Sequence, residues 1–268
     1  MKLGISYNLF DGEELLEYSI KYIRNQVDYI SVVFQKESYF GDKSSERLTD
    51  TLQDLLNRKY IDEIYEYHPA IDYDADHVKG HTQTIDKRNI GLALSKSNNC
   101  THHMCMDTDE FYIPEQFAYM KKICENTEIF SSVCQHKQYY KDSIYMILPT
   151  EQEFIETIFQ ITEQSQFVYE MPHILPIDPS RKTNSPNCYR FSRNEIEMHH
   201  MSFVRKYLYR KLMCCLSRKH IEHNIEKIVE HYKNWKYPMQ GMWAGGNLVD
   251  IVKVDRIFDI YPSTENIS

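Results

Sequence analysis

The sequence predicts an α/β fold, in which a Rossmann-like mixed sheet has helices on its faces, from three observations. Short apolar runs that are typical of buried strands recur through the first 112 residues. Segments with apolar residues at helical spacing lie between these runs. One run, which ends at Cys105-Met106, is followed at once by acidic residues, and open α/β sheets usually bind ligands where a buried strand ends. The 268 residues, 42% of them apolar, are enough for one domain with a sizeable core.

The first elements in chain order are expected to form a β-α-β unit with a right-handed crossover. Residues 2–7 are expected to be the first strand, 13–25 the helix and 28–35 a fully buried second strand. An amphipathic helix over 48–58 and a short strand over 61–67 follow. This order of elements is that of a nucleotide-binding α/β half.

The later elements are predicted from the same patterns, with one left open. Residues 154–162 fit a helix or a strand equally well. Residues 240–246 are expected to be a flexible loop that could order over a ligand, and 249–258 an edge strand. The remaining expectations are helices over 84–94, 115–125, 204–216 and 221–235, a loop over 95–99, and a strand over 129–134.

The stretch Asp107-Thr108-Asp109-Glu110 places three carboxylates in four positions. Such carboxylates repel one another unless a cation lies among them. Oxygen ligands suit a hard divalent ion, Mg²⁺ or Mn²⁺. An extended backbone would point Asp107 and Asp109 to the same side, and replacing Asp109 by Asn is expected to cost little stability. The alternative is a solvated acidic turn.

The motif Arg88-Asn89-x-Gly91-x-Ala93, followed by a strand that ends in Asp107-x-Asp109, resembles the GT-A glycosyltransferases, especially the family 2-like group. The resemblance covers roughly the first half of the chain. It implies a GT-A fold and a metal-dependent hexosyltransferase of polysaccharide biosynthesis, which moves a sugar from a nucleotide-diphosphate donor to a glycan or other hydroxyl acceptor. Inversion is expected, with retention left open. The expected single domain divides into a nucleotide-sugar half (1–112), an acceptor half (113–203) and a helical C-terminal extension (204–268).

The resemblance also implies the metal site. Asp107 and Asp109 would bind Mn²⁺ or Mg²⁺, Asp109 most directly, and His199 or His200 would complete the coordination. Only one of the two histidines can face inward if this segment is a strand. A core or hydrogen-bonded role for the pair is the alternative.

Donor and acceptor contacts follow from position in the resembled enzymes. The loop after the first strand and the end of the second would bind the base and ribose, although these residues could equally be turn and strand-end residues. Inversion requires a base that deprotonates the acceptor hydroxyl, and the sequence does not separate Asp178 from Glu170. The expected nucleotide-sugar contacts are Tyr7, Asn8, Gln35, Lys87, Arg88, Asp107 and Arg205.

Composition limits the partners and the compartment. A net charge of −8 gives no reason to expect nucleic acid. Seven cysteines without regular spacing argue against a secreted disulfide framework, and no apolar run is long enough for a signal peptide or a membrane span. A cytoplasmic protein is expected, with a UDP-sugar favoured over a guanosine donor and a glycan or lipid-linked acceptor. The basic residues over 205–219 indicate either a solvated helix face or contact with diphosphate or with an anionic membrane.

Two other functions remain open from the sequence. The acid pair would also serve a metal-dependent phosphoesterase or nucleotidyltransferase, although residues 8–12 lack the Gly-rich, Lys-containing loop of the latter. A non-catalytic module that binds glycan or nucleotide is the second. Hydrolysis of sugar nucleotides with and without Mn²⁺ distinguishes all three.

Overall fold

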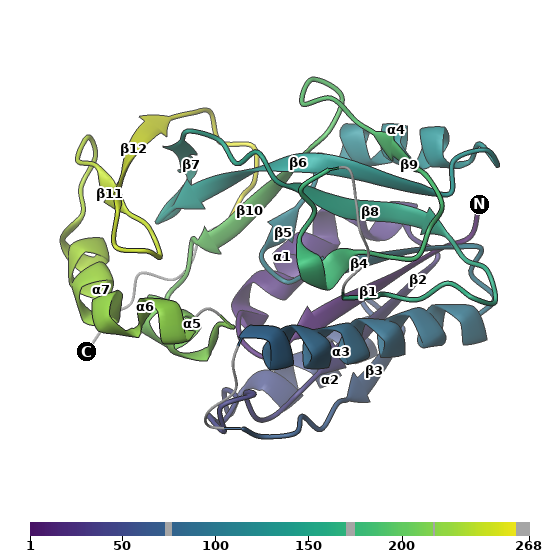
Figure 1. Ribbon diagram of the computed structural model, residues 1–268, viewed down its shortest axis with the longest axis horizontal. Helices are drawn as coiled ribbons and strands as arrows, with labels where there is room; N and C mark the ends of the chain where they lie inside the picture. The colour runs from purple at the N-terminus through teal and green to yellow at the C-terminus, as the bar shows by residue number, and fades with distance from the viewer. Residues whose placement is uncertain (73–76, 170–174, 217, 261–268) are drawn as a thin grey trace.

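The computed structural model describes residues 1–72, 77–169, 175–216 and 218–260. Its centre is a 12-stranded mixed sheet in which nine strands follow the order β11-β12-β7-β6-β8-β4-β1-β2-β3. Helices flank this sheet, and a group of helices lies at one end of the molecule (Figure 1). The predicted fold class, a mixed α/β sheet with flanking helices and a helical C-terminal region, is confirmed.

The N-terminal strands form the parallel part of the sheet. β1 (Leu3–Leu9) lies between β2 (Tyr29–Phe34) and β4 (His102–Asp107), and β3 (Glu63–Glu66) pairs with β2. All of these pairs are parallel, as the alternation of strands and helices in the sequence predicts. Three strands therefore end at the same edge of the sheet, where β1 is followed by residues 10–12, β2 by Gln35 and β4 by Thr108.

Helices cover both faces of this parallel part (Figure 1). Side chains of α1 (Glu13–Ile23), α2 (Leu48–Asn57) and α4 (Pro114–Cys124) share one apolar core with β1 and β2. α3 (His77–Ser97) packs against β1, β2 and β4 from the other face. The helix expected over 84–94 is thus longer at both ends, because α3 buries polar residues and its apolar periodicity stops short of the helix ends.

The strand β1 explains why α3 carries a glycine at position 91. Leu3, Ile5 and Tyr7 point into the core on the α1 side, so Ser6 points toward α3. A Cβ atom on Gly91 would lie 2.2 Å from Ser6 Oγ, a distance that real structures do not show. The glycine of the Arg-Asn-x-Gly-x-Ala motif therefore permits close packing of helix on strand.

The second half of the chain extends the sheet with both antiparallel and parallel strand pairs. Residues 154–162, left open from the sequence, form β8 (Phe154–Gln160), which joins β4 to β6 (Ser131–Tyr140). β10 (Glu197–Phe203) pairs with β6 and with the short β5 (Glu110–Phe111), and β9 (Cys188–Arg190) also pairs with β6. The pairing of β10 with β5 places His200 opposite Glu110, next to the acidic stretch.

The last strands form a hairpin, which corrects two expectations. Residues 240–246 are not a loop over a ligand, since β11 (Gly241–Met242) pairs with β12 (Leu248–Lys253) and Trp243 stacks on Phe203. β12 also pairs with β7 (Asp142–Leu148), so it is an inner strand and β11 is the edge.

The C-terminal helices are shorter than expected. The helix expected over 204–216 is α5 (Leu208–Cys214), which starts four residues later than expected. Arg205 lies in the segment before it and is held in buried ion pairs. The helix expected over 221–235 is divided into α6 (Arg218–Ile221), the 3₁₀ turn η3 (Glu222–Asn224) and α7 (Ile225–Asn234). Two other 3₁₀ turns are η1 (Arg24–Gln26) and η2 (Pro179–Arg181).

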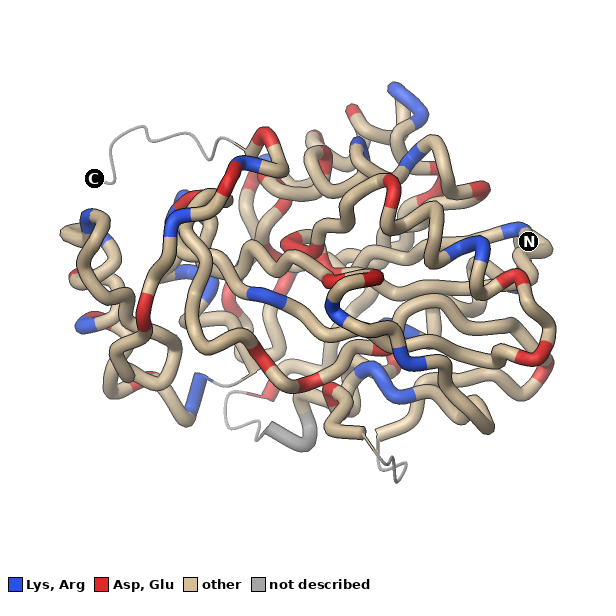
Figure 2. Tube along the Cα trace, turned by 90° about the horizontal axis from the view of Figure 1, so that it is seen from above, with Lys and Arg blue, Asp and Glu red and all other residues tan. Residues whose placement is uncertain are grey.

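Charged residues of both signs are interspersed along the chain (Figure 2). The surface near α5 carries acidic as well as basic side chains. Asp11 pairs with Arg210, and Asp42 pairs with Arg218. Among the helices of the described residues, none combines the length and the apolar character needed to cross a membrane.

Candidate functional site

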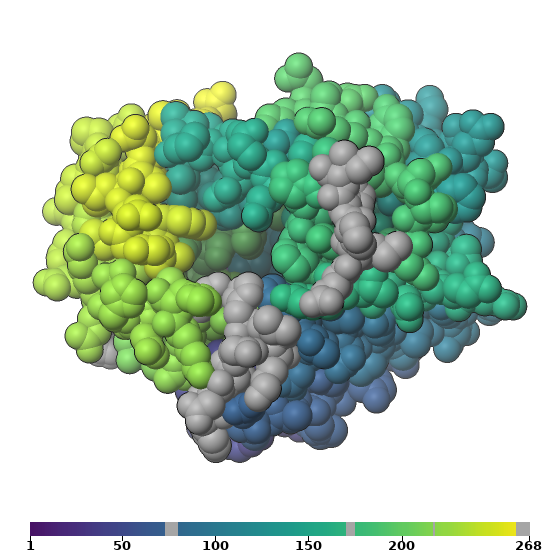
Figure 3. All heavy atoms as spheres, in the orientation of Figure 1, coloured from purple at the N-terminus to yellow at the C-terminus, as the bar shows by residue number. Residues whose placement is uncertain are grey.

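A cavity of about 350 Å³ lies at the edge of the sheet where β1, β2 and β4 end. Parallel strands of open α/β sheets bind ligands at this edge. Figure 3 shows a hollow in the surface between the yellow-green part of the chain, which contains the C-terminal helices and β12, and the teal and green part. The lining comes from strand ends, from α3 and from residues far along the chain: Asn8, Phe10, Asp11, Gln35, Ser38, Tyr39, His81, Thr84, Lys87, Arg88, Asp107, Thr108, Asp109, Asp178, Ser180, Arg205, Lys211, Cys214, Cys215 and Leu216.

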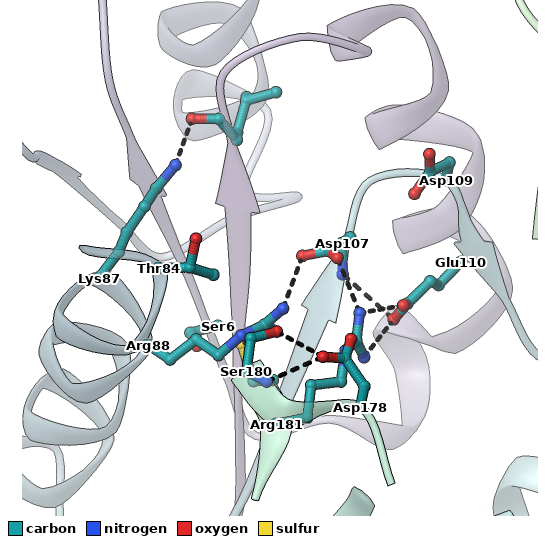
Figure 4. Close-up of polar contacts among 12 residues, drawn as sticks. Ser6, Thr84, Lys87, Arg88, Asp107, Asp109, Glu110, Asp178, Ser180 and Arg181 are labelled. Carbon is teal, nitrogen blue, oxygen red and sulfur yellow. Dashed lines mark hydrogen bonds and ion pairs between the residues drawn. The ribbon is translucent and has the colours of Figure 1, made fainter. Parts of the chain in front are cut away.

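Asp107, at the end of β4, is held between two arginines (Figure 4). Its Oδ2 accepts a hydrogen bond from Arg181 Nη2 at 2.8 Å, and its Oδ1 lies 3.5 Å from Arg88 Nη2. Arg181 also donates to both carboxylate oxygens of Glu110, and its Nη1 lies 3.0 Å from Oε2. Arg181 therefore joins two of the three carboxylates of the acidic stretch.

The third carboxylate, Asp109, has a separate set of partners. Its side chain is only 2% exposed, and Oδ2 accepts from Arg205 Nη2 at 2.5 Å and from Lys211 Nζ at 3.2 Å. Its Oδ1 lies 3.4 Å from His200 Nε2. Arg205 is itself buried and also binds Asp11 Oδ2 at 2.9 Å.

These cations set the ionisation of the acidic residues. Burial alone would raise the pKa of Asp107, but Arg88 and Arg181 outweigh it and lower this pKa. Burial opposes ionisation of Asp109 too, and Lys211, His200 and Arg205 together hold its pKa well below the usual value. Both side chains are therefore carboxylates at neutral pH, and arginine and lysine side chains supply the cations that such a cluster needs.

Asp107 and Asp109 both line the cavity, but they have separate partners and are not alternate residues of one extended strand. β4 ends at Asp107, and Thr108 and Asp109 form a turn before β5 begins at Glu110. Figure 4 shows Asp109 apart from the group formed by Asp107, Glu110 and Arg181. The alternation rule for strands does not apply across this turn, because it holds only while the chain remains extended.

Strand alternation does separate the two histidines on β10. His199 is buried, its Nδ1 lies 2.7 Å from Tyr139 Oη, and its ring packs on Phe258. Burial lowers the pKa of His199 to about 3. His200 faces Asp109 instead. The structure thus gives His199 the core role that the sequence left open, and leaves His200 beside the acidic residue.

Tyr7 is not a site residue, which corrects its expected contact with the nucleotide. Its ring is fully buried in the core on the α1 side, and its hydroxyl lies 3.0 Å from Ser19 Oγ. The next residue, Asn8, points to the other side and lines the cavity. Both polar atoms of the Asn8 side chain are buried and have no hydrogen-bond partner among the described residues.

Gln35 and Lys87 line the cavity beside the end of β1. Lys87 Nζ donates to the Leu9 carbonyl at 2.8 Å and to Gln35 Oε1 at 3.1 Å. Burial lowers the pKa of Lys87 to about 7. Arg88 is buried one residue further along α3, where its Nη1 lies 2.9 Å from Cys105 Sγ.

Of the two candidate bases, Asp178 lines the cavity and Glu170 lies outside the described residues. Ser180 donates from its backbone N and from Oγ to Asp178 Oδ1, at 2.8 and 2.9 Å. Burial raises the pKa of Asp178, but Arg181 and Arg88 more than compensate and leave it lowered. Its side chain is 34% exposed, so an ionised carboxylate is accessible from the cavity.

The sequence reasoning missed three residues of this site. These are Asp11, Arg181 and Lys211. Lys211 belongs to the basic residues over 205–219, for which the sequence left a solvated face and an anion contact open, and the patterns single out neither Asp11 nor Arg181. The only signal in the sequence was the lack of any acidic residue between Met201 and His220 around Lys211. Pairing across so many residues cannot be predicted from local patterns.

The described side chains do not fit the expected divalent ion. No three His, Cys, Asp or Glu side chains among them are grouped as metal ligands. Asp109 and His200 are the pair nearest to such a site, but both oxygens of Asp109 already face nitrogen atoms of Arg205, Lys211 and His200. An ion bound there would lie next to two fixed side-chain cations that repel it.

No protein-family model matches this sequence, and no curated protein does. The chain is similar to the crystal structure of S. aureus TarS 1-349, with a TM-score of 0.47 and 10% identity over 87% of this chain and 72% of that one. For the same TarS fragment in complex with UDP the TM-score is 0.47 and the identity 10%, over 88% of this chain and 76% of that one. For its complex with UDP-GlcNAc the TM-score is 0.44 and the identity 10%, over 87% of this chain and 73% of that one. Nothing about the chemistry of the cavity is concluded from likenesses this low.

Proposed function

We propose that this chain is a glycosyltransferase that moves a sugar from a nucleoside diphosphate sugar to a hydroxyl acceptor. The main observation is one cavity, at the ligand-binding edge of the sheet, that contains three kinds of group. An unpartnered amide lies on Asn8, cationic side chains surround Asp107 and Asp109, and an accessible carboxylate lies on Asp178. A nucleobase, a diphosphate and an acceptor hydroxyl need these three kinds of group.

The Asn8 amide suits a nucleobase. It offers one donor and one acceptor side by side, and both are buried without a partner among the described residues. Buried polar groups left unpaired are costly, so a ligand that pairs both atoms gains affinity. Uracil and guanine each present an N–H next to a carbonyl oxygen. A uridine donor is favoured.

The cations suit the diphosphate. Lys87, Arg88, Arg205 and Lys211 all line the cavity, and charge develops on the leaving phosphate as the bond to the sugar breaks. Donors that are already fixed in place stabilise such charge at little reorganisation cost. Asp107 holds Arg88 in position, and Asp109 holds Arg205 and Lys211. Lys87 is held by the Leu9 carbonyl and by Gln35.

Asp178 is proposed as the general base of an inverting reaction. The acceptor oxygen forms a bond to the anomeric carbon, and the bond from that carbon to the phosphate oxygen breaks. The electron pair of the broken bond stays on the diphosphate, and the acceptor proton passes to the Asp178 carboxylate. Replacing Asp178 by Asn should lower transfer by about 10²–10⁴-fold and leave UDP affinity unchanged.

Two measurements test the proposal. Calorimetric titration with UDP should show binding, and Asn8→Leu should weaken it by about tenfold, the cost of one or two unmade hydrogen bonds. Slow hydrolysis without acceptor is expected for at least one of UDP-glucose, UDP-galactose and UDP-GlcNAc. Each sugar nucleotide is assayed in two media, one with a chelator and one with Mn²⁺. Absence of binding and of hydrolysis in both media would reject the proposed function. Binding without hydrolysis would favour a non-catalytic module, and release of free UMP would favour a phosphoesterase.

Metal dependence, the hexosyl class, a glycan or lipid-linked acceptor and contact with an anionic membrane remain predictions of the resemblance. Asp109, His200 and phosphate oxygens would hold an ion, which would act as a Lewis acid on the diphosphate. The donor set does not favour this ion, and for that reason each assay includes a chelator.

A further inference from the structure

The positive charge beside Asp109 comes from two residues near the start of the C-terminal helical region. Arg205 precedes α5 and Lys211 lies within it, and both bind the same oxygen of Asp109. Asp109 is almost completely buried, so this carboxylate does not face solvent. An acid at the position expected to bind metal thus holds side-chain cations.

Arg205 and Lys211 differ in how far their N–H donors remain accessible to a ligand. Arg205 donates from Nε to the Ser202 carbonyl, from Nη1 to Asp11 and from Nη2 to Asp109, and its side chain is 1% exposed. Lys211 is 29% exposed and lines the cavity. Among the described residues, Asp109 is the single acceptor for the Lys211 ammonium. An ammonium has three N–H donors, so two of them remain for a ligand in the cavity.

We propose that the ammonium of Lys211, oriented by Asp109, replaces the divalent ion at the leaving diphosphate, and that transfer does not depend on metal. This inference rests on the proposed function. As the bond from the sugar to the phosphate oxygen breaks, Lys211 meets the negative charge that grows on the diphosphate. Arg205 acts through Asp109 and is a positioning residue, because each of its three nitrogens already donates a hydrogen bond and its side chain is only 1% exposed.

Charge balance gives the physical reason for this substitution. A divalent ion on Asp109 would have to displace Lys211 and Arg205 or lie beside them at close range, where like charges repel. A lysine side chain needs no metal from solution, and its ammonium group is a compact point charge. The same Asp-x-Asp motif can therefore serve to anchor a cation that belongs to the protein.

The experiment compares wild type, Lys211→Met, Lys211→Arg and a matched control, Lys227→Met, on an exposed position of α7. UDP affinity is measured by calorimetry and UDP-sugar hydrolysis by UDP release, each in EDTA and in Mn²⁺. In wild type both quantities should agree between the two media within about threefold, since no ion is needed. Lys211→Met should lower hydrolysis by about 10²–10³-fold, the usual effect of removing one such donor. Lys211→Arg should recover part of the rate, and Lys227→Met should match wild type.

The outcomes separate this inference from the proposed function. Wild-type UDP binding and hydrolysis that occur only with Mn²⁺ would overturn the inference and leave the glycosyltransferase in place. A folded Lys211→Met protein, shown by its melting temperature, that hydrolyses UDP-sugar at the wild-type rate in EDTA would also overturn it. Loss of binding and hydrolysis in both media for wild type would instead refute the proposed function.

Discussion

Replacing Asp109 by Asn should destabilise the protein strongly, which reverses the expectation from the sequence. The carboxylate is 2% exposed and compensates Arg205, which is 1% exposed, together with Lys211. Removing one member of a buried ion pair leaves the other charge uncompensated and typically costs about 3–5 kcal/mol. Arg205 retains Asp11 at 2.9 Å, so the lower end, about 3 kcal/mol, is expected. For a chain of this length that loss corresponds to a melting temperature lower by about 6–12 °C.

Thermal unfolding followed by circular dichroism measures this effect, with Asp54→Asn as the matched control. Asp54 is 58% exposed and pairs with Arg58 on the surface of α2, where such an ion pair contributes at most about 1 kcal/mol. The control should melt within a few degrees of wild type. If Asp109→Asn melts with it, the carboxylate does not balance buried cations, and the reasoning about Lys211 loses its basis.

Three further outcomes follow from the contacts. Burial raises the pKa of Glu156 from 4.5 to about 7, so about 3 kcal/mol of folding stability is present below pH 4.5 and is lost as the pH rises through 7. In urea unfolding, the stability of Glu156→Gln should therefore depend less on pH than that of wild type. His199→Ala should lower stability by about 2–3 kcal/mol in the same assay, whereas His200→Ala, on the other side of the strand, should affect UDP-sugar hydrolysis more than stability. Gly91→Ala should cost about 1–3 kcal/mol because its Cβ would clash with Ser6; an unchanged melting temperature would contradict the close packing.

The parallel part of the fold was predictable because its signals are local. Apolar runs give β1 and β2 directly, and helical spacing gives α1 and α2 to within about two residues at each end. Prediction was poorer for α3, since residues 77–83 and 95–97 at its two ends are mostly polar and do not continue the apolar spacing of residues 84–94. It also failed at residues 240–246, where pairing with β12 gives order to a stretch that looks irregular in the sequence.

The candidate site shows the same division. Five of the expected nucleotide-sugar contacts line one cavity, because strand ends and the middle of α3 are positioned by the fold itself: Asn8, Gln35, Lys87, Arg88 and Asp107. The expected contact of Tyr7 failed by one residue, which is enough to place a side chain on the other face of a strand.

The acidic stretch illustrates what a local pattern can establish about charge. Three neighbouring carboxylates do require compensation, and the sequence reasoning was right on that point. It could not identify the source of the positive charge, because Arg181 lies 74 residues from Asp107 and Lys211 lies 102 residues from Asp109. A metal is the simplest source when only neighbouring residues are considered. Once the sheet brings β10 and α5 against the end of β4, arginine and lysine side chains become the nearer cations, and they are present whether or not metal is. Since these same ion pairs join the end of β4 to residues 181, 205 and 211 in the last third of the chain, the stability of the fold and the charge of the site depend on one set of contacts.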